Sequence, residues 1–391
     1  MTPFTADSLS LTRRDYASLA AAIGCIVVVG IGLSLSIPLL SFALDAKGAS
    51  KTTIGLNTAM AGLATIVLAP FVTRLATRYG VRRMITASIL LGAATLPAFL
   101  LIEPIWAWFP LRFLFAVSLT ILFVLSEYWI NAVAPENSRG LILGFYASAL
   151  SLGFAAGPAI LTVLGTEGPA PYLAGAALFL LAGLPMMLAG DMAPDITDEP
   201  NHGFASFLWV APAATVAALV FGAAESAGFA LLPLYGTAMG FDAAGAAGLI
   251  SAMAPGNLAF QIPMGLLADR VDKRFVLLFG GLIGTAGMVL ITFVPMPQPV
   301  LVAVLVTWGG IVAGLYTVGL AHLGSRFRGA DLAQANAAFV VMYATGMLLG
   351  PPIAGVGMDF WPPHGLPATL ALIFAAYFVV VAAQLASEAR R

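Results

Sequence analysis

The chain has 391 residues, of which 60% are hydrophobic and only 9% are charged, and its formal net charge is -1. Soluble globular domains carry about a quarter charged residues, so this composition excludes that class and indicates an integral membrane protein. The balanced charge, without a basic patch, argues against a nucleic-acid partner. Cys25, the single cysteine, lies in the first apolar run, so the sequence offers neither a disulfide framework nor a thiolate metal site.

Apolar runs of about 20 residues or more recur along the chain, and each is long enough as a helix to cross a hydrocarbon core of about 30 Å. The first run follows Arg13 and Arg14 and lacks a small-residue cleavage site, so we interpret it as a retained span rather than a signal peptide. We predict twelve transmembrane helices, at residues 17–43, 52–76, 83–102, 106–133, 139–164, 170–190, 206–235, 243–267, 274–294, 299–324, 331–357 and 365–387.

Arginine and lysine are shared unequally between the two sets of loops that twelve spans create. Fourteen of them fall on the side that holds both termini, and three fall on the other side, namely Lys47, Lys51 and Arg112. Short loops rich in these residues stay in the cytoplasm. We therefore predict a multi-pass protein of the cell inner membrane with both termini cytoplasmic.

An acidic, proline-bearing stretch at 191–205 separates the sixth and seventh predicted spans. We predict an N-terminal six-helix bundle at 1–190, a cytoplasmic inter-half loop at 191–205, and a C-terminal six-helix bundle at 206–391. At an offset of 192 to 195 residues the halves match at Pro38 and Pro233, Met60 and Met253, Pro70 and Pro263, Gly153 and Gly346, Gly157 and Gly350, and Pro158 and Pro351. The expected fold is all-α, with two pseudo-symmetric bundles, a plan that places a solute site at mid-membrane in secondary transporters.

The loop after the eighth span reads GLLADRVDKR, from Gly265 to Arg274. Its spacing and charge order resemble the cytoplasmic signature of the major facilitator superfamily, a resemblance that covers the whole chain and implies a transporter fold. The first-half copy, TRLATRYGVRR, has Thr73 and Thr77 where the signature has glycine and aspartate. The resemblance implies a cytoplasmic latch, for which the candidates are Gly265, Asp269, Arg270, Arg274, Arg78, Gly80, Arg82, Arg83, Glu127, Glu136 and Arg139.

Two shorter matches bear on the solute. Gly144, Gly153, Gly157 and Pro158 resemble a signature of proton-coupled drug antiporters, although glycines at this spacing also let membrane helices pack closely. The segment SEYWINAVAPENSRG, with the fifth span, resembles the YcaD-like permeases, a group that we associate with bacterial uptake carriers of the riboflavin type. These resemblances leave vitamin uptake and drug efflux both open.

Two acidic residues fall in the interior of predicted spans, where ionisable groups are expensive and often functional. Glu127 lies about 20 residues, or about 30 Å, into a helix that starts outside, which places it near the cytoplasmic end. We expect it to pair within the latch, with proton handling or substrate contact beside Tyr128, Trp129 and Asn131 as the alternative. Glu225 lies about 19 residues into the seventh span, in a run of alanines and glycines, and its counterpart in the first half is Gly30. Such a carboxyl would exchange protons in a cavity, or else bond a neighbouring helix.

The remaining candidates for solute binding are one cation, three amides and five aromatic residues. Arg112, in the outer part of the fourth span, would either attract an anionic group or extend to the lipid headgroups. Asn257 and Gln261 are four residues apart and share a helix face, and Asn57 lies in the second span. The aromatic candidates for stacking on a flat ligand are Phe229, Phe260, Trp308, Tyr316 and Tyr343.

The sequence therefore predicts a proton-coupled or otherwise gradient-driven permease for a small organic solute, with riboflavin as the specific candidate and drug/proton antiport as the rival. A membrane scaffold that does not transport is the alternative from another class. No metal-ligand cluster, phosphate loop or nucleophile elbow is present in the sequence, so we predict no enzyme activity, no cofactor and no metal. The expected partners are the solute, a proton or other coupling ion and the lipid bilayer, and we expect a monomer.

Overall fold

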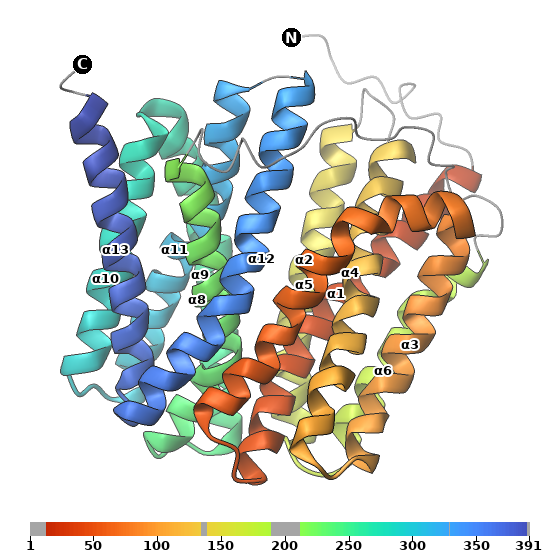
Figure 1. The fold of residues 1–391 in the computed structure, drawn as a ribbon, viewed down its shortest axis with the longest axis horizontal. Coiled ribbons are helices and arrows are strands. Elements are labelled where there is room, and N and C mark those ends of the chain that lie inside the picture. The colour runs from red at the N-terminus through yellow and green to blue at the C-terminus, as the bar shows by residue number, and fades with distance from the viewer. Residues whose placement is uncertain (1–12, 134–138, 189–211, 328, 389–391) are drawn as a thin grey trace. The chain divides into compact units, whose positions relative to one another are not determined.

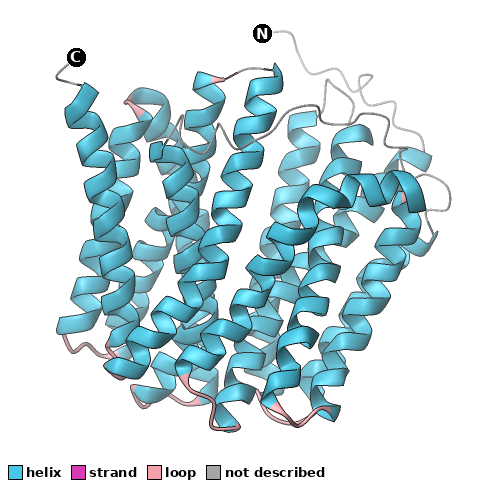
Figure 2. Ribbon diagram, viewed as in Figure 1, coloured by secondary structure: helices cyan, strands magenta, loops and turns pink. Residues whose placement is uncertain are grey.

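The computed structural model describes residues 13–133, 139–188, 212–327 and 329–388. In these residues the chain forms twelve long helices and one short 3-10 turn, η2 (Ile105–Ala107), and no strand (Figure 1, Figure 2). The helices are α1 (Arg13–Ala46), α2 (Lys51–Tyr79), α3 (Val81–Leu101), α4 (Trp108–Val133), α5 (Arg139–Leu164), α6 (Ala170–Leu188), α8 (Pro212–Ala238), α9 (Ala243–Arg270), α10 (Lys273–Phe293), α11 (Gln298–Arg326), α12 (Gly329–Phe360) and α13 (Gly365–Glu388).

Each predicted span coincides with one of these helices, which confirms the all-helical fold. Several helices extend past their predicted ends: α12, predicted at 331–357, runs from Gly329 to Phe360. Hydropathy marks only the window that lies in hydrocarbon, whereas backbone hydrogen bonding continues into the polar interface. The predicted inter-half loop at 191–205 and the first residues of the seventh span, 206–211, lie outside the described residues, so the domain boundaries stay predictions.

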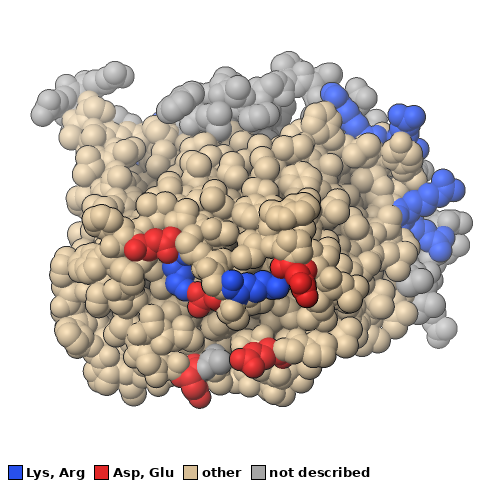
Figure 3. Space-filling model, turned by 60° about the horizontal axis from the view of Figure 1, so that its bottom comes forward, with Lys and Arg blue, Asp and Glu red and all other residues tan. Residues whose placement is uncertain are grey.

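The surface of the helices is that of a protein immersed in lipid. Large apolar side chains are exposed on several helices, among them Leu152 (71%), Val163 (81%) and Leu372 (72%). In the described part of the chain nine helices are long and apolar enough to cross a membrane. The face turned forward in Figure 3 is mostly uncharged: acidic and basic side chains gather across its middle, and further basic side chains lie at the right edge of the view. Such apolar surface is stable in a hydrocarbon environment and not in water.

The chain divides into two compact units. The first contains residues up to Leu39 and Val67–Glu199, and the second contains Leu40–Ile66 and the residues from Pro200 onward. The division passes through α1 and α2, so the last turns of α1 and the first four turns or so of α2 belong with the second unit. The hairpin of these two helices therefore connects both units.

In the first unit α1 and α5 approach each other at glycines. A Cβ atom on Gly153 would lie 2.7 Å from the carbonyl oxygen of Val27 and 3.0 Å from Cα of Gly30. Ser34 Oγ donates to the carbonyl oxygen of Gly30 and also lies 3.1 Å from that of Gly153. The glycines at this position of α5 thus serve close helix packing.

The second unit repeats this arrangement with α8 and α12. A Cβ atom on Gly346 would overlap the carbonyl oxygen of Leu219 and lie 2.8 Å from the amide nitrogen of Ala223. One turn later, a Cβ atom on Gly350 would overlap backbone atoms of Ala223. Gly346 and Gly350 are the residues that align with Gly153 and Gly157 at the offset found in the sequence. The internal match is therefore reflected in equivalent packing within each unit.

Candidate functional site

Glu225 lies at the midpoint of α8, about 20 Å from either end at 1.5 Å per residue. It is flanked by small buried residues: Gly222, Ala223, Ala224, Ser226, Ala227 and Gly228. These allow α12 to approach so closely that a Cβ atom on Gly222 would overlap the carbonyl oxygen of Tyr343. As a result the Tyr343 side chain reaches the carboxyl group, and its Oη donates a hydrogen bond to Glu225 Oε2.

Four aromatic rings from three helices surround this hydrogen bond, and we call them the aromatic cluster: Phe221, Tyr316, Phe339 and Tyr343. The Tyr316 ring lies 5.6 Å from that of Tyr343, 5.7 Å from Phe221 and 5.0 Å from Phe339, centre to centre. Phe221 and Tyr343 are stacked at 6.1 Å, with 27° between their planes. Phe339 is fully buried, whereas the other three rings are half-buried and so retain exposed area.

The surroundings of Glu225 provide little to neutralise its charge. In the described part of the chain its hydrogen-bond partner is Tyr343, and no cation forms an ion pair with it. The neighbouring Ser226 is 3% exposed, and its Oγ has no partner among the described residues. A half-buried carboxyl at the middle of a membrane helix, beside aromatic faces, has the composition of a site that binds a solute or a proton.

The other aromatic candidates lie apart from this cluster. Trp308 is 6% exposed, its Nε1 donates to the carbonyl oxygen of Gly284 at 3.1 Å, and its ring meets Phe374 edge-on at 5.7 Å. These contacts show that Trp308 packs between helices in the protein interior. Phe229 is also buried, and Phe260 is half-buried against Gly310. Of the five predicted rings, Tyr316 and Tyr343 are the two that the structure brings together with Glu225.

The predicted amides differ in their surroundings. Asn57 of α2 belongs to the second unit, is 1% exposed, and has no partner for its Nδ2 among the described residues. Asn257 of α9 is exposed, and the side chain of Gln261 lies outside the described residues. That these two amides contact one solute together stays a prediction. Asn57 therefore has the stronger structural reason to contact a ligand, because a buried amide without a partner is costly.

Arg112 lies in the first unit, four residues into α4. Its side chain is 2% exposed, and Nη1 donates to the carbonyl oxygen of Ser36 at 3.2 Å. The guanidinium group is thus held inside the protein and does not extend along the surface toward headgroups.

In the first-half copy of the predicted latch, Gly80 is the single residue between α2 and α3, and its φ of 86° requires glycine there. Arg78, Arg82 and Arg83 are exposed around this turn, and the Arg78 guanidinium lies 5.4 Å from the centre of the Tyr79 ring. Glu127 is exposed and lies six residues before the end of α4. Glu136 and the Arg139 side chain lie outside the described residues, so the pairing of these groups stays a prediction.

In the second-half copy the ion pair found is one that we did not predict from the sequence. Asp272 is the N-cap of α10: its Oδ1 accepts from the amide of Arg274 at 2.9 Å, and Arg274 Nη2 lies 2.6 Å from Oδ2. The hydrogen bond from the Arg274 side chain lowers the pKa of Asp272 from 3.8 to about 2. Arg270 is exposed, and the Asp269 side chain lies outside the described residues. An acid directly before a helix start is an N-cap signal that would have identified Asp272.

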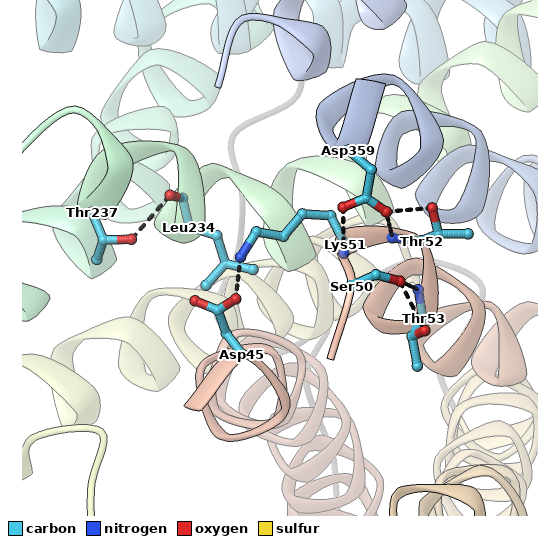
Figure 4. Close-up of polar contacts among 8 residues, drawn as sticks. All are labelled: Asp45, Ser50, Lys51, Thr52, Thr53, Leu234, Thr237 and Asp359. Atoms are coloured by element: carbon cyan, nitrogen blue, oxygen red, sulfur yellow. Dashed lines mark hydrogen bonds and ion pairs between the residues drawn. The ribbon is translucent and has the colours of Figure 1, made fainter. Parts of the chain in front are cut away.

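At the opposite end of the second unit, the N-terminus of α2 is capped by α12 (Figure 4). The Asp359 carboxylate accepts from the amides of Lys51 and Thr52, each at 2.8 Å, and from Thr52 Oγ1 at 2.5 Å. Lys51 Nζ forms an ion pair with Asp45, at the end of α1. Asp359 is thus a second functional candidate that sequence reasoning missed, because its partners are about 307 residues away.

A two-unit helical membrane protein with glycine-packed helices and a mid-helix carboxyl has the characteristics of a secondary transporter. The model of the Major Facilitator Superfamily matches residues 22–259 and 246–390, and the chain belongs to this family. It is therefore a multi-pass membrane transporter of the MFS type rather than an enzyme.

Its relatives share the family at low identity. The chain is 23% identical over 337 residues to the MFS-type transporter YfkF of Bacillus subtilis (strain 168), covering 84% of this chain and 85% of YfkF. It is 23% identical over 319 residues to an MFS-type transporter of Enterobacter sp. (strain 638), covering 79% and 80%.

Among solved structures, a mutant of the nucleoside transporter NupG superposes with a TM-score of 0.78 at 16% identity, over 96% of this chain and 99% of NupG. A bacterial homologue of the human lysosomal transporter Spinster, inward-facing and unoccupied, gives 0.77 at 13% identity over 96% of each chain. These similarities establish the fold.

Proposed function

We propose that the protein carries a small, planar organic solute across the inner membrane, that the solute contacts the aromatic cluster, and that Glu225 exchanges the coupling proton. The observation that carries this proposal is the hydrogen bond between Glu225 and Tyr343 at the middle of α8, within reach of three half-buried rings. The latch, the cytoplasmic termini and the monomeric state remain parts of the proposal.

Proton coupling follows from the cost of charge at this depth. An ionised carboxyl at mid-membrane is expensive, so reorientation of the transporter is favoured when Glu225 carries a proton. The Tyr343 hydroxyl stabilises the ionised form by donating to it, which lets the carboxyl release its proton without a cation beside it. Proton binding and solute binding then influence each other through the same residue pair.

The solute class follows from the rings. Tyr316, Tyr343 and Phe221 are half-buried, so each keeps some accessible area, and planar heteroaromatic molecules stack on aromatic rings. Riboflavin is the specific candidate. The structural relative NupG is described as a nucleoside transporter, and nucleosides, like riboflavin, carry a planar heteroaromatic ring system. An organic cation would pair with Glu225 in exchange for protons, which keeps drug/proton antiport as the rival function.

Alternating access requires the α1–α2 hairpin to change its contacts. Because Asp359 holds the N-terminus of α2 within the second unit, we propose that these hydrogen bonds form when the outer side is closed and break when it opens.

The test is solute uptake by purified protein in liposomes with an imposed inward proton gradient. The panel is riboflavin, a pyrimidine nucleoside and a lipophilic cation, with wild type beside Glu225→Gln. Glu167→Gln is the matched control, since Glu167 is exposed in the turn between α5 and α6. Saturable riboflavin or nucleoside entry that is lost in Glu225→Gln alone supports the proposal.

Two outcomes would contradict the proposed function. If only the cation moves, in exchange for protons, the protein is an antiporter. If uptake by Glu225→Gln equals that of wild type at every gradient, Glu225 does not carry the proton.

A further inference from the structure

One end of the second unit has a polar hollow that the transport site does not use. It is an open hollow with a volume of about 380 Å³, and it is lined by Val271, Asp272, Lys273, Arg274, His322, Ser325 and Arg326. Its residues come from the start of α10 and the end of α11, two helices in contact. The hollow is large enough for a small headgroup, since ligand sites commonly measure about 300–1,000 Å³.

The charge in the hollow is positive. Lys273, Arg274 and Arg326 contribute three cations, and Asp272 offsets one of them through its ion pair with Arg274. In the described part of the chain neither Lys273 nor Arg326 has an ion-pair partner. The N-terminus of α10, a helix of 21 residues, adds the positive end of its dipole beside Lys273.

A buried nitrogen lines the same hollow. His322 is 6% exposed, and its Nε2 has no hydrogen-bond partner among the described residues. His322 and Arg326 are four residues apart on α11 and therefore share a face. A buried polar atom without a partner costs free energy, and a ligand bound in the hollow would supply the missing hydrogen bond.

We infer that this hollow binds a phosphoryl group. Lys273 and Arg326 supply the charge, and His322 Nε2 completes the contacts from the buried side. The group belongs either to an anionic phospholipid, whose headgroup lies at the level of a helix end, or to a soluble phosphate. The inference does not depend on the identity of the transported solute.

The experiment measures binding rather than transport, with the purified full chain at constant ionic strength, because salt screens exposed charges. One arm counts phosphatidylglycerol retained in phosphatidylcholine nanodiscs by native mass spectrometry. The other titrates inorganic phosphate into protein in phosphatidylcholine nanodiscs by calorimetry. The variants are Lys273→Gln/Arg326→Gln, and as matched control Lys47→Gln/Arg74→Gln, two exposed cations outside the hollow.

We expect the hollow variant to lose affinity by about tenfold or more in one arm, since each contact is a charge-assisted hydrogen bond, while the control keeps wild-type affinity. Loss in the phosphatidylglycerol arm alone identifies a lipid headgroup, and loss in the phosphate arm identifies a soluble phosphate. If neither probe binds, or if both double variants lose affinity equally, the inference is wrong.

His322 gives an independent check that does not alter the fixed charge. His322→Gln keeps an N–H donor at a similar position and is expected to retain the ligand, whereas His322→Leu removes the donor and is expected to lose it. Equal affinity of these two variants would show that His322 does not contact the phosphoryl group.

Discussion

The hydroxyl of Tyr343 and the carboxyl of Glu225 face each other across two helices whose backbones are nearly in contact. Hydrogen bonds to charged groups contribute about 1.5–3 kcal/mol, so removing this donor changes how readily the carboxyl releases its proton. Tyr343→Phe retains the ring for stacking and deletes only the hydroxyl. We expect proton-driven uptake to fall by about tenfold or more, while solute binding without a gradient changes little.

The measurement is uptake in proteoliposomes as a function of the imposed gradient, beside equilibrium binding of the same solute. Tyr316→Phe is the control, because Tyr316 belongs to the same aromatic cluster and Tyr343 is the hydrogen-bond partner found for Glu225. If Tyr343→Phe keeps the wild-type dependence on the gradient, the hydroxyl has no part in coupling.

At the scale of helices, the glycines of α12 determine how closely it approaches α8. A methyl group at Gly346 would overlap the carbonyl oxygen of Leu219. This oxygen belongs to the backbone of α8, so it cannot move aside as the end of a flexible side chain can. We expect Gly346→Ala to destabilise the protein by about 1–3 kcal/mol and to disrupt the contact of Tyr343 with Glu225. A Cβ atom on Gly248 of α9 would have no other atom within 4 Å. Gly248→Ala is therefore expected to be neutral or to stabilise the protein by up to about 1 kcal/mol.

Thermal unfolding of both variants in the same detergent checks this expectation. Each substitution replaces glycine by alanine inside a long helix, so the change in helix propensity is the same in both variants. A difference between their melting temperatures therefore reports the difference in packing. Equal melting temperatures would show that α8 and α12 tolerate a wider separation than the structure indicates.

The start of α10 allows a prediction about pH. The pKa of Asp272 is lowered to about 2, mainly by the hydrogen bond from Arg274, so its carboxylate contributes to stability at all pH values above its ordinary pKa of 3.8. This contribution is lost as pH falls from 3.8 through 2. Asp272→Ala removes an N-cap and is expected to cost about 0.5–2 kcal/mol, with a difference from wild type that stays constant between about pH 5 and pH 8.

Differential scanning fluorimetry across that range measures the difference. Asp242→Ala is the comparison, because Asp242 caps α9 through the amide of Gly245 at 2.8 Å and no side-chain ion pair is found for it in the described residues. A difference that changes with pH between 5 and 8 would contradict the cause assigned to the lowered pKa.

At the scale of the molecule, the fold was predictable because each helix corresponds to a continuous apolar segment of the sequence. Twelve apolar windows identify twelve helices, and the aligned glycines anticipate that both units pack alike. The site was predictable only in part: Glu225, Tyr316 and Tyr343 each stood out as unusual residues in a span, but nothing in the sequence paired them. Asp359 was missed altogether, since its partners lie 307 and 308 residues away and no local pattern links them.

That long-range cap leads to a prediction about the transport cycle. A carboxylate at a helix N-terminus accepts from otherwise unpaired amides and meets the positive end of the helix dipole, and losing such a cap costs about 0.5–2 kcal/mol. Asp359→Ala should therefore shift the balance between closed and open positions of the α1–α2 hairpin by roughly 2- to 30-fold toward open. The buried Cys25 is the single cysteine, so a Cys25→Ala background permits labelling elsewhere.

Spin labels at Lys47 and Ala238, both exposed in the second unit, report the distance from the hairpin tip to the end of α8 by double electron–electron resonance. We expect Asp359→Ala to increase the population at long distances, and Asp242→Asn to leave it unchanged, because Asp242 caps α9 and not α2. A solute that is bound from outside should increase the same long-distance population in wild type. If Asp359→Ala leaves the distance distribution of wild type unaltered, the cap has no part in holding the hairpin.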